Sequence, residues 1–149
     1  MKIGIVGTGA VGGFYGGLLA KNGNDVHFLL NSYYEYVKEN GLQIDSELLV
    51  NIRLTHVNAY PTSNEMPPCD IIMVCLKTLS NQSLLPAILP PILKENSIVI
   101  LVQNGLGIEA ELAELFPKIS IAGGLAFIAS NKVGPGHIHH IDQGHINIG

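Results

Sequence analysis

Residues 2–12 read KIGIVGTGAVG, and this stretch decides the fold that the sequence predicts. Residues 2–6 form a short apolar run rich in β-branched side chains, which is typical of a buried strand. An apolar helix is predicted from about residue 10 to residue 21, ending at Asn22-Gly23. The turn between strand and helix carries three spaced glycines: Gly7, Gly9 and Gly12. The opening therefore predicts a strand, a tight turn and a helix in that order.

Glycines at this spacing are the fingerprint of dinucleotide binding when they lie between a strand and a helix. The first permits the tight turn, the second lets the backbone approach a pyrophosphate, and the third lets the helix pack closely on the strand. Free N–H groups and the helix dipole would attract the phosphates to the helix N-terminus. A purely structural glycine turn is the alternative. We expect six residues to hold the cofactor: Gly7, Thr8, Gly9, Ala10, Val11 and Gly12.

Three further glycines lie inside the predicted helix: Gly13, Gly16 and Gly17. Each costs a helix up to about 1 kcal/mol relative to alanine. Something must therefore approach this helix closely, and tight packing against the sheet alone is one explanation.

The end of the second strand should discriminate between NAD and NADP. Residues 25–30 (DVHFLL) are predicted as that strand, parallel to the first. An acid about 20 residues after the glycines holds the ribose hydroxyls of NAD, whereas an arginine suits the 2′-phosphate of NADP. This chain has Asn31 and Ser32 there, which can hydrogen-bond a ribose or a phosphate but supply no full charge. Alternatively, both residues simply begin the next helix, predicted over residues 33–39 with Ser32 as its cap.

Two polar residues follow later strands at the edge where open α/β sheets bind their ligands. Lys77 follows the apolar strand predicted over residues 70–76, where it could meet a cofactor phosphate or ribose, or a substrate carboxylate. Asn104 follows the strand predicted over residues 97–102 and offers both a donor and an acceptor. The alternatives are an ordinary solvated lysine and a turn residue that tolerates a left-handed backbone.

The rest of the chain continues the βα alternation and then becomes rich in strands. Two short strands are predicted over residues 42–57, and helices over residues 80–93 and 108–115. Further strand is predicted over residues 119–122 and 125–129, and a terminal hairpin over residues 137–148, with its turn at Gln143-Gly144. The predicted fold is α/β, a Rossmann-type doubly wound, mostly parallel sheet with helices on both faces and a C-terminal β-hairpin. Residues 1–149 are predicted as one dinucleotide-binding domain.

Composition limits the possible functions. The 149 residues are 47% apolar and 13% charged, which describes a compact fold and argues against disorder. The formal net charge is −4 and the 8 Lys and Arg residues form no basic stripe, so no nucleic-acid partner is expected. No apolar run reaches the roughly 20 residues that span a bilayer, and the N-terminus lacks a secretory cleavage site. We expect no membrane association and a soluble, cytoplasmic protein.

Cysteines and histidines give no support for a disulfide or a metal site. Cys69 and Cys75 lie at opposite ends of one predicted strand, roughly 20 Å apart, which is too far for a disulfide and fits a reducing compartment. On a strand, His137 and His139 would face one side and His140 the other, and no cysteine or paired carboxylate completes a ligand set with them or with His145. No convincing Ser-His-Asp arrangement is present either.

Several segments together resemble the ketopantoate reductase family: KIGIVGTGAVGGFYGGLLAKNGNDVHFLL, DIIMVCLKT, VQNGLG, AGGLAFIAS and GPGHIHHIDQGHINIG. They follow the order and spacing of that family over essentially the whole chain. The resemblance implies an NADP(H)-binding N-terminal domain joined to a helical C-terminal domain. It also implies hydride transfer from the nicotinamide to the ketone of 2-dehydropantoate, giving pantoate on the route to coenzyme A. It places Lys77 near the cofactor, and Asn104 near the nicotinamide ribose and the substrate hydroxyl.

The chain departs from that family in two ways. The family commonly has arginine at the position of Asn31, where it would pair with the 2′-phosphate, so the preference for NADP over NAD is left open. The family's catalytic lysine and substrate-anchoring glutamate belong to its C-terminal half, whereas this sequence stops at Gly149. We therefore expect a truncated chain with an intact cofactor site, an incomplete active site, and exposed surface that could support a homodimer.

Three hypotheses remain at this point. The first is the cofactor-binding half of a ketopantoate reductase-like oxidoreductase. The second is a reductase of the same architecture that acts on another 2-oxo acid, and the third is a module that binds NADP(H) without turnover. Under the first, the chain should bind NADP(H) weakly and show no reductase activity.

Overall fold

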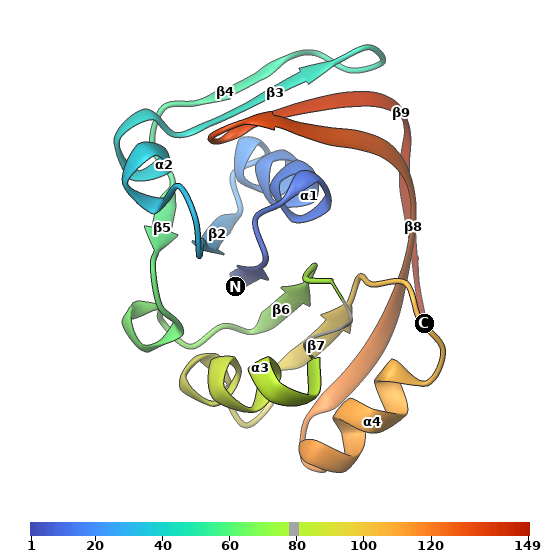
Figure 1. The fold of residues 1–149 in the computed structure, drawn as a ribbon. Helices are drawn as coiled ribbons and strands as arrows, with labels where there is room; N and C mark the ends of the chain where they lie inside the picture. The colour runs from blue at the N-terminus through green and yellow to red at the C-terminus, as the bar shows by residue number, and fades with distance from the viewer. Residues whose placement is uncertain (78–80) are drawn as a thin grey trace.

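A computed structural model describes residues 1–77 and 81–149 as a mixture of strands and helices (Figure 1). The strands are β1 (Lys2–Val6), β2 (Asp25–Leu29), β3 (Leu42–Ser46), β4 (Ile52–Leu54), β5 (Asn58–Tyr60), β6 (Ile71–Val74), β7 (Ile98–Leu101), β8 (Ser120–Gly134) and β9 (His137–Ile148). The helices are α1 (Ala10–Lys21), α2 (Tyr34–Asn40), α3 (Asn81–Ile88) and α4 (Ile108–Leu115), with short 3-10 turns η1 (Ser63–Glu65) and η3 (Pro90–Ile92).

All of these strands belong to one curled sheet in the order β4-β3-β9-β8-β7-β6-β1-β2-β5. Neighbouring strands are parallel except in the pairs β3–β4 and β8–β9. From β1 the chain goes to β2 on one side and later to β6 on the other. The point between β1 and β6 is therefore the topological switch of the sheet, where such folds bind ligands.

Helices cover both faces of the sheet, as the sequence predicts (Figure 1). Because the sheet curls, β3, β8 and β9 reach the far side of α1, and one core surrounds that helix with side chains such as Ile5, Phe28 and Ile138. A second core lies between the opposite face and α3 with α4, and it contains Leu85 and Leu112. The central strands are buried on both faces, which explains why their sequences are continuous apolar runs.

The glycines inside α1 are explained by this enclosure. A Cβ atom on Gly13 would lie 2.2 Å from Ile138 Cδ1, and one on Gly17 would lie 2.5 Å from Ile44 Cδ1. A Cβ on Gly16 would lie 2.5 Å from the Phe28 ring on the other side of the helix. Strands on two sides of α1 therefore leave little room for side chains at these positions, and packing accounts for the three glycines.

Several predicted elements have different boundaries in the structure. The terminal hairpin consists of β8 and β9 and turns at Pro135-Gly136, so the turn predicted at Gln143-Gly144 is wrong. Gln143-Gly144 is instead an irregularity within β9, where Phe127 pairs with His145 and Ile128 with Gln143. The segments predicted separately over 119–122 and 125–129 belong to the single strand β8.

Three further differences concern residues 32–93. Ser32 does not cap α2: the cap residue is Tyr33, in a left-handed conformation with φ 62°. β5, which pairs in parallel with β2, was not predicted because it is short and adjoins a proline-rich segment. The helix predicted from residue 80 begins outside the described residues, and its described part is α3 followed by η3.

Candidate functional site

The glycine turn lies at the switch point of the sheet. Gly7 follows β1 with φ 96°, a conformation that favours glycine, and α1 begins three residues later at Ala10. The residues that follow β6 pack against this turn, since a Cβ on Gly7 would lie 3.0 Å from the backbone of Cys75 and Leu76. Burial raises the pKa of the Cys75 thiol, so this cysteine acts as a neutral packing residue.

The three fingerprint glycines differ in what surrounds them. A Cβ on Gly12 would lie 2.1 Å from the Gly7 carbonyl oxygen and 3.1 Å from Ile5 Cγ2, so helix and strand touch there. A Cβ on Gly9, in contrast, would have no atom of residues 1–77 or 81–149 within 4 Å, apart from its two chain neighbours. Packing among the described residues therefore requires glycine at positions 7 and 12 but not at position 9, where the space is open to an external group.

The N-terminus of α1 is suited to an anion. The N–H groups of a first helical turn have no partner within the helix, and no acidic side chain occupies the first turn of α1. The Thr8 hydroxyl donates to the Leu29 carbonyl oxygen at 3.0 Å and ties the glycine turn to the end of β2. The Ser130 hydroxyl of β8 donates to the Ala10 carbonyl oxygen at 3.2 Å, a contact that sequence reasoning missed because 120 residues separate the two.

Asn31 and Ser32 lie where the sequence places them, immediately after β2, and both are exposed. The backbone N–H of Leu30 donates to the Tyr60 carbonyl oxygen at 2.9 Å, which fixes the strand end from the β5 side. Since α2 begins only at Tyr34, neither residue belongs to a helix. Both side chains are accessible to a ligand at this edge.

Lys77 and Asn104 also lie at this edge, after β6 and β7, and both are exposed. The Gln103 side-chain amide donates to the Leu76 carbonyl oxygen and so joins the two loops. The left-handed glycines of the second loop are Gly105 and Gly107, so the interpretation of Asn104 as a left-handed turn residue is wrong. A role for Lys77 and Asn104 in binding stays a prediction.

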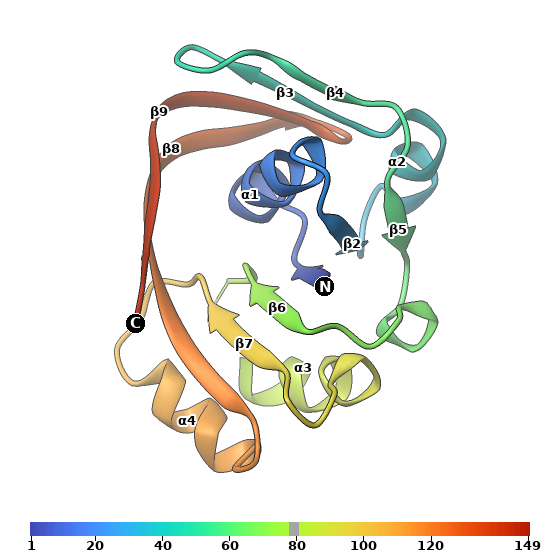
Figure 2. The ribbon, with the colours of Figure 1, turned by 180° about the vertical axis from the view of Figure 1, so that it is seen from behind.

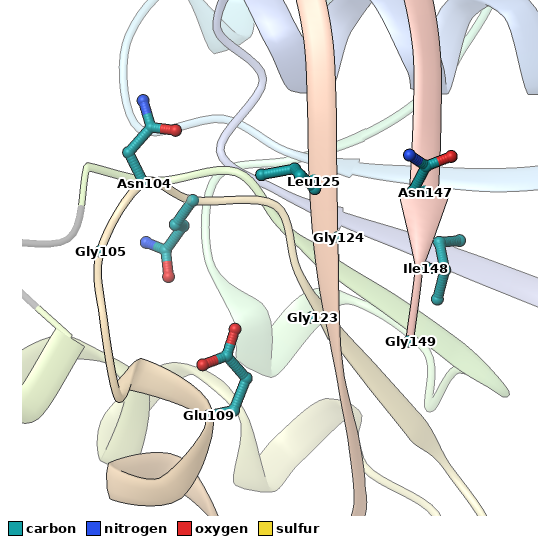
Figure 3. A pocket seen from close by; sticks show the side chains of 10 residues that line it. Asn104, Gly105, Glu109, Gly123, Gly124, Leu125, Asn147, Ile148 and Gly149 are labelled. Atoms are coloured by element: carbon teal, nitrogen blue, oxygen red, sulfur yellow. The ribbon is translucent and has the colours of Figure 1, made fainter.

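An open pocket of about 450 Å³ begins at Asn104 (Figure 3). Its wall consists of the β7–α4 loop, the first turn of α4, and the adjacent parts of β8 and β9. Glu109 of α4 contributes a carboxylate that faces Gly123, and Asn147 contributes an amide from β9 (Figure 3). Neither residue was singled out from the sequence, because nothing in their local pattern shows that α4 and the end of β9 meet.

The C-terminal histidines make separate contacts. His137 Nε2 lies 2.6 Å from Asp45 Oδ2, and His139 Nε2 lies 2.8 Å from Glu47 Oε1. His140 is fully buried, with Nδ1 2.8 Å from Ser46 Oγ and Nε2 2.9 Å from the Gln143 carbonyl oxygen. Within residues 1–77 and 81–149, no group of three or more His, Cys, Asp and Glu side chains is arranged to hold a metal ion.

The match to known proteins decides the family. Residues 3–149 match the sequence model described as ketopantoate reductase PanE/ApbA. The chain belongs to this ketopantoate reductase family. A 2-dehydropantoate 2-reductase from a Nostoc species is 53% identical over 148 residues, which is 99% of this chain and 46% of the relative.

Solved structures of ketopantoate reductases have the same fold. The 2-dehydropantoate 2-reductase from Geobacter metallireducens has a TM-score of 0.93 and 41% identity, covering 100% of this chain and 49% of that one. The enzyme from Methylococcus capsulatus has a TM-score of 0.91 and 32% identity, covering 99% and 48%. The chain thus spans about half the length of the ketopantoate reductases that it matches. None of the helices in the described part of the chain has the length and apolarity that a membrane span requires.

Proposed function

We propose that this chain binds NADP(H) as the cofactor half of an enzyme that reduces 2-dehydropantoate to pantoate. The observation that carries the proposal is the open space at Gly9, beside two glycines that the protein's own packing requires. In this arrangement the pyrophosphate lies on the first turn of α1, and the backbone N–H groups of Ala10 and Val11 donate to it. The donors and the space at the site fit the cofactor.

The other site residues lie on either side of this anchor. Asn31 and Ser32, after β2, face the adenosine ribose, while Lys77 and Asn104 lie on the side of the nicotinamide. The bound cofactor supplies a hydride for the ketone of a 2-oxo acid. The amide of Asn104 orients the nicotinamide ribose and a substrate hydroxyl, and the neighbouring pocket with Glu109 receives the substrate.

Turnover also needs a group that gives a proton to the developing alkoxide. We propose that this group lies outside residues 1–149, since the chain spans about half of its relatives. The 149-residue chain then binds cofactor without reducing substrate. We propose that substrate selectivity also depends mainly on residues outside 1–149.

Calorimetric titration with NADPH and NADH, together with an assay of NADPH oxidation by 2-dehydropantoate, tests the proposal. We expect saturable but weak NADPH binding and no turnover. If neither cofactor binds, the cofactor site is refuted. If the chain turns over 2-dehydropantoate by itself, the proton donor lies within residues 1–149 and that part of the proposal is wrong.

A further inference from the structure

A lysine from the β8–β9 hairpin lies beside the end of β2. Lys132 Nζ is 4.6 Å from the centroid of the Tyr33 ring, a cation–π distance. Tyr33 follows Asn31 by two residues and is 53% exposed. The sequence supplies no charge at Asn31 itself, but the fold brings one to the same place from 100 residues further along the chain.

The hairpin runs from the proposed pyrophosphate anchor toward the end of β2. Ser130 and Lys132 lie on the same face of β8, because side chains alternate along a strand and the pairing with β9 is regular between them. Ser130 contacts Ala10 at the start of α1, and Lys132 lies roughly 6.6 Å further along the strand. The hairpin passes over α1 and its tip lies beside α2 (Figure 2), where a Cβ on Gly136 would contact Gly41 and Val37.

Three other cations of the chain have carboxylate partners. Lys2, Arg53 and Lys94 pair with carboxylates at 3.0, 2.7 and 2.7 Å. Lys132 makes no ion pair with any residue that the structure describes, and its side chain is exposed. An ammonium group held only by a ring keeps its three donors available for an anion.

We propose that Lys132 recognises the 2′-phosphate of NADP(H), replacing the arginine that commonly follows the second strand in NADP-binding folds. This inference rests on the proposed cofactor site. Tyr33 positions the ammonium above the ribose end of the site, and Asn31 with Ser32 donates to the same phosphate. The chain therefore prefers NADP(H) to NAD(H) although it has asparagine at position 31.

Dissociation constants for NADPH and NADH, measured on the 149-residue chain at low ionic strength, test this. Lys132→Met removes the charge and keeps the length of the side chain, and we expect it to weaken NADPH binding about five- to tenfold while NADH binding stays within about twofold. Lys132→Arg should keep the preference. Lys118→Met, an exposed lysine after α4, is the matched control and should change neither constant. Equal urea midpoints would show that the variants are folded.

The outcomes separate this inference from the function on which it rests. Equal affinity of the wild-type chain for NADPH and NADH, or an unchanged NADPH constant in Lys132→Met, overturns the role of Lys132 and leaves the cofactor site standing. Equal weakening of both cofactors shows that Lys132 only supports the hairpin, which also overturns the inference. Failure of the wild-type chain to bind either cofactor refutes the site itself, and the role of Lys132 with it.

Discussion

Gly9→Ala should weaken cofactor binding, whereas Gly12→Ala should reduce stability, although both variants change a fingerprint glycine. At Gly9 the added methyl group meets no atom within 4 Å from the described part of the chain, its two chain neighbours apart, and the backbone is extended at φ −90° and ψ −155°. At Gly12 the same methyl group lies 2.1 Å from the Gly7 carbonyl oxygen. One substitution fills space where we propose that the pyrophosphate lies, and the other forces α1 away from the sheet.

The expected magnitudes follow from these surroundings. Gly9→Ala weakens the helix cap by about 0.5–1 kcal/mol, which the reduced entropy of the unfolded chain largely offsets. Its free energy of unfolding should therefore stay within about 1 kcal/mol of wild type. Blocking one charge-assisted hydrogen bond to a phosphate, at about 1.5–3 kcal/mol, should weaken NADPH binding about ten- to a hundredfold. Gly12→Ala should lose about 3 kcal/mol of stability or more, because backbone must move.

Urea unfolding and NADPH titration of both variants provide the measurements. Wild-type affinity in Gly9→Ala would refute our explanation of that glycine, because no ligand would then approach the backbone there. A stable Gly12→Ala chain would show that the contact between helix and strand is not tight.

Three further predictions concern stability and thiol chemistry. Burial lowers the pKa of His27, so this side chain binds a proton more readily in the unfolded chain than in the folded one. The free energy of unfolding should therefore fall as pH drops below about 6.5. His27→Gln should reduce this dependence of stability on pH, measured by urea unfolding between pH 5 and 8. An unchanged slope in the variant would contradict this. His140→Ala should cost about 3 kcal/mol because it opens a cavity and removes the hydrogen bonds to Ser46 Oγ and the Gln143 carbonyl oxygen, and a loss below about 1 kcal/mol would count against that packing. Burial raises the pKa of Cys69 to about 11 and also raises the pKa of Cys75. A disulfide reagent at pH 8 should therefore label both thiols at least about a hundredfold faster in the unfolded chain than in the folded one. Rapid labelling of the folded protein would contradict this prediction.

Local sequence patterns predicted the parts of the fold that local chemistry determines. The strand, glycine turn and α1 follow from residues 2–21, and α4 has its predicted bounds of 108–115. The hairpin turn was misplaced because Gln143-Gly144 and Pro135-Gly136 are both turn signals, and only the pairing of β8 with β9 selects between them. The position of β9 beside β3 depends on long-range packing around α1.

The candidate site also contains some residues that the sequence could predict and others that it could not. The glycine turn was predictable because the spacing of three glycines within six residues is itself a dinucleotide-binding motif. Ser130 and Lys132 were not, because they reach the site from a hairpin that only the curled sheet brings over α1. Glu109 was missed for a related reason, since the pocket beside it forms where α4 meets the ends of β8 and β9.

Amide chemical shifts recorded during a titration with NADPH test the central claim most directly. If the pyrophosphate binds at the N-terminus of α1, saturable changes should be largest at Gly9, Ala10 and Val11, with further changes after β2 and at Asn104. Shifts confined to another face, or no saturable shift at all, would contradict the proposed cofactor site.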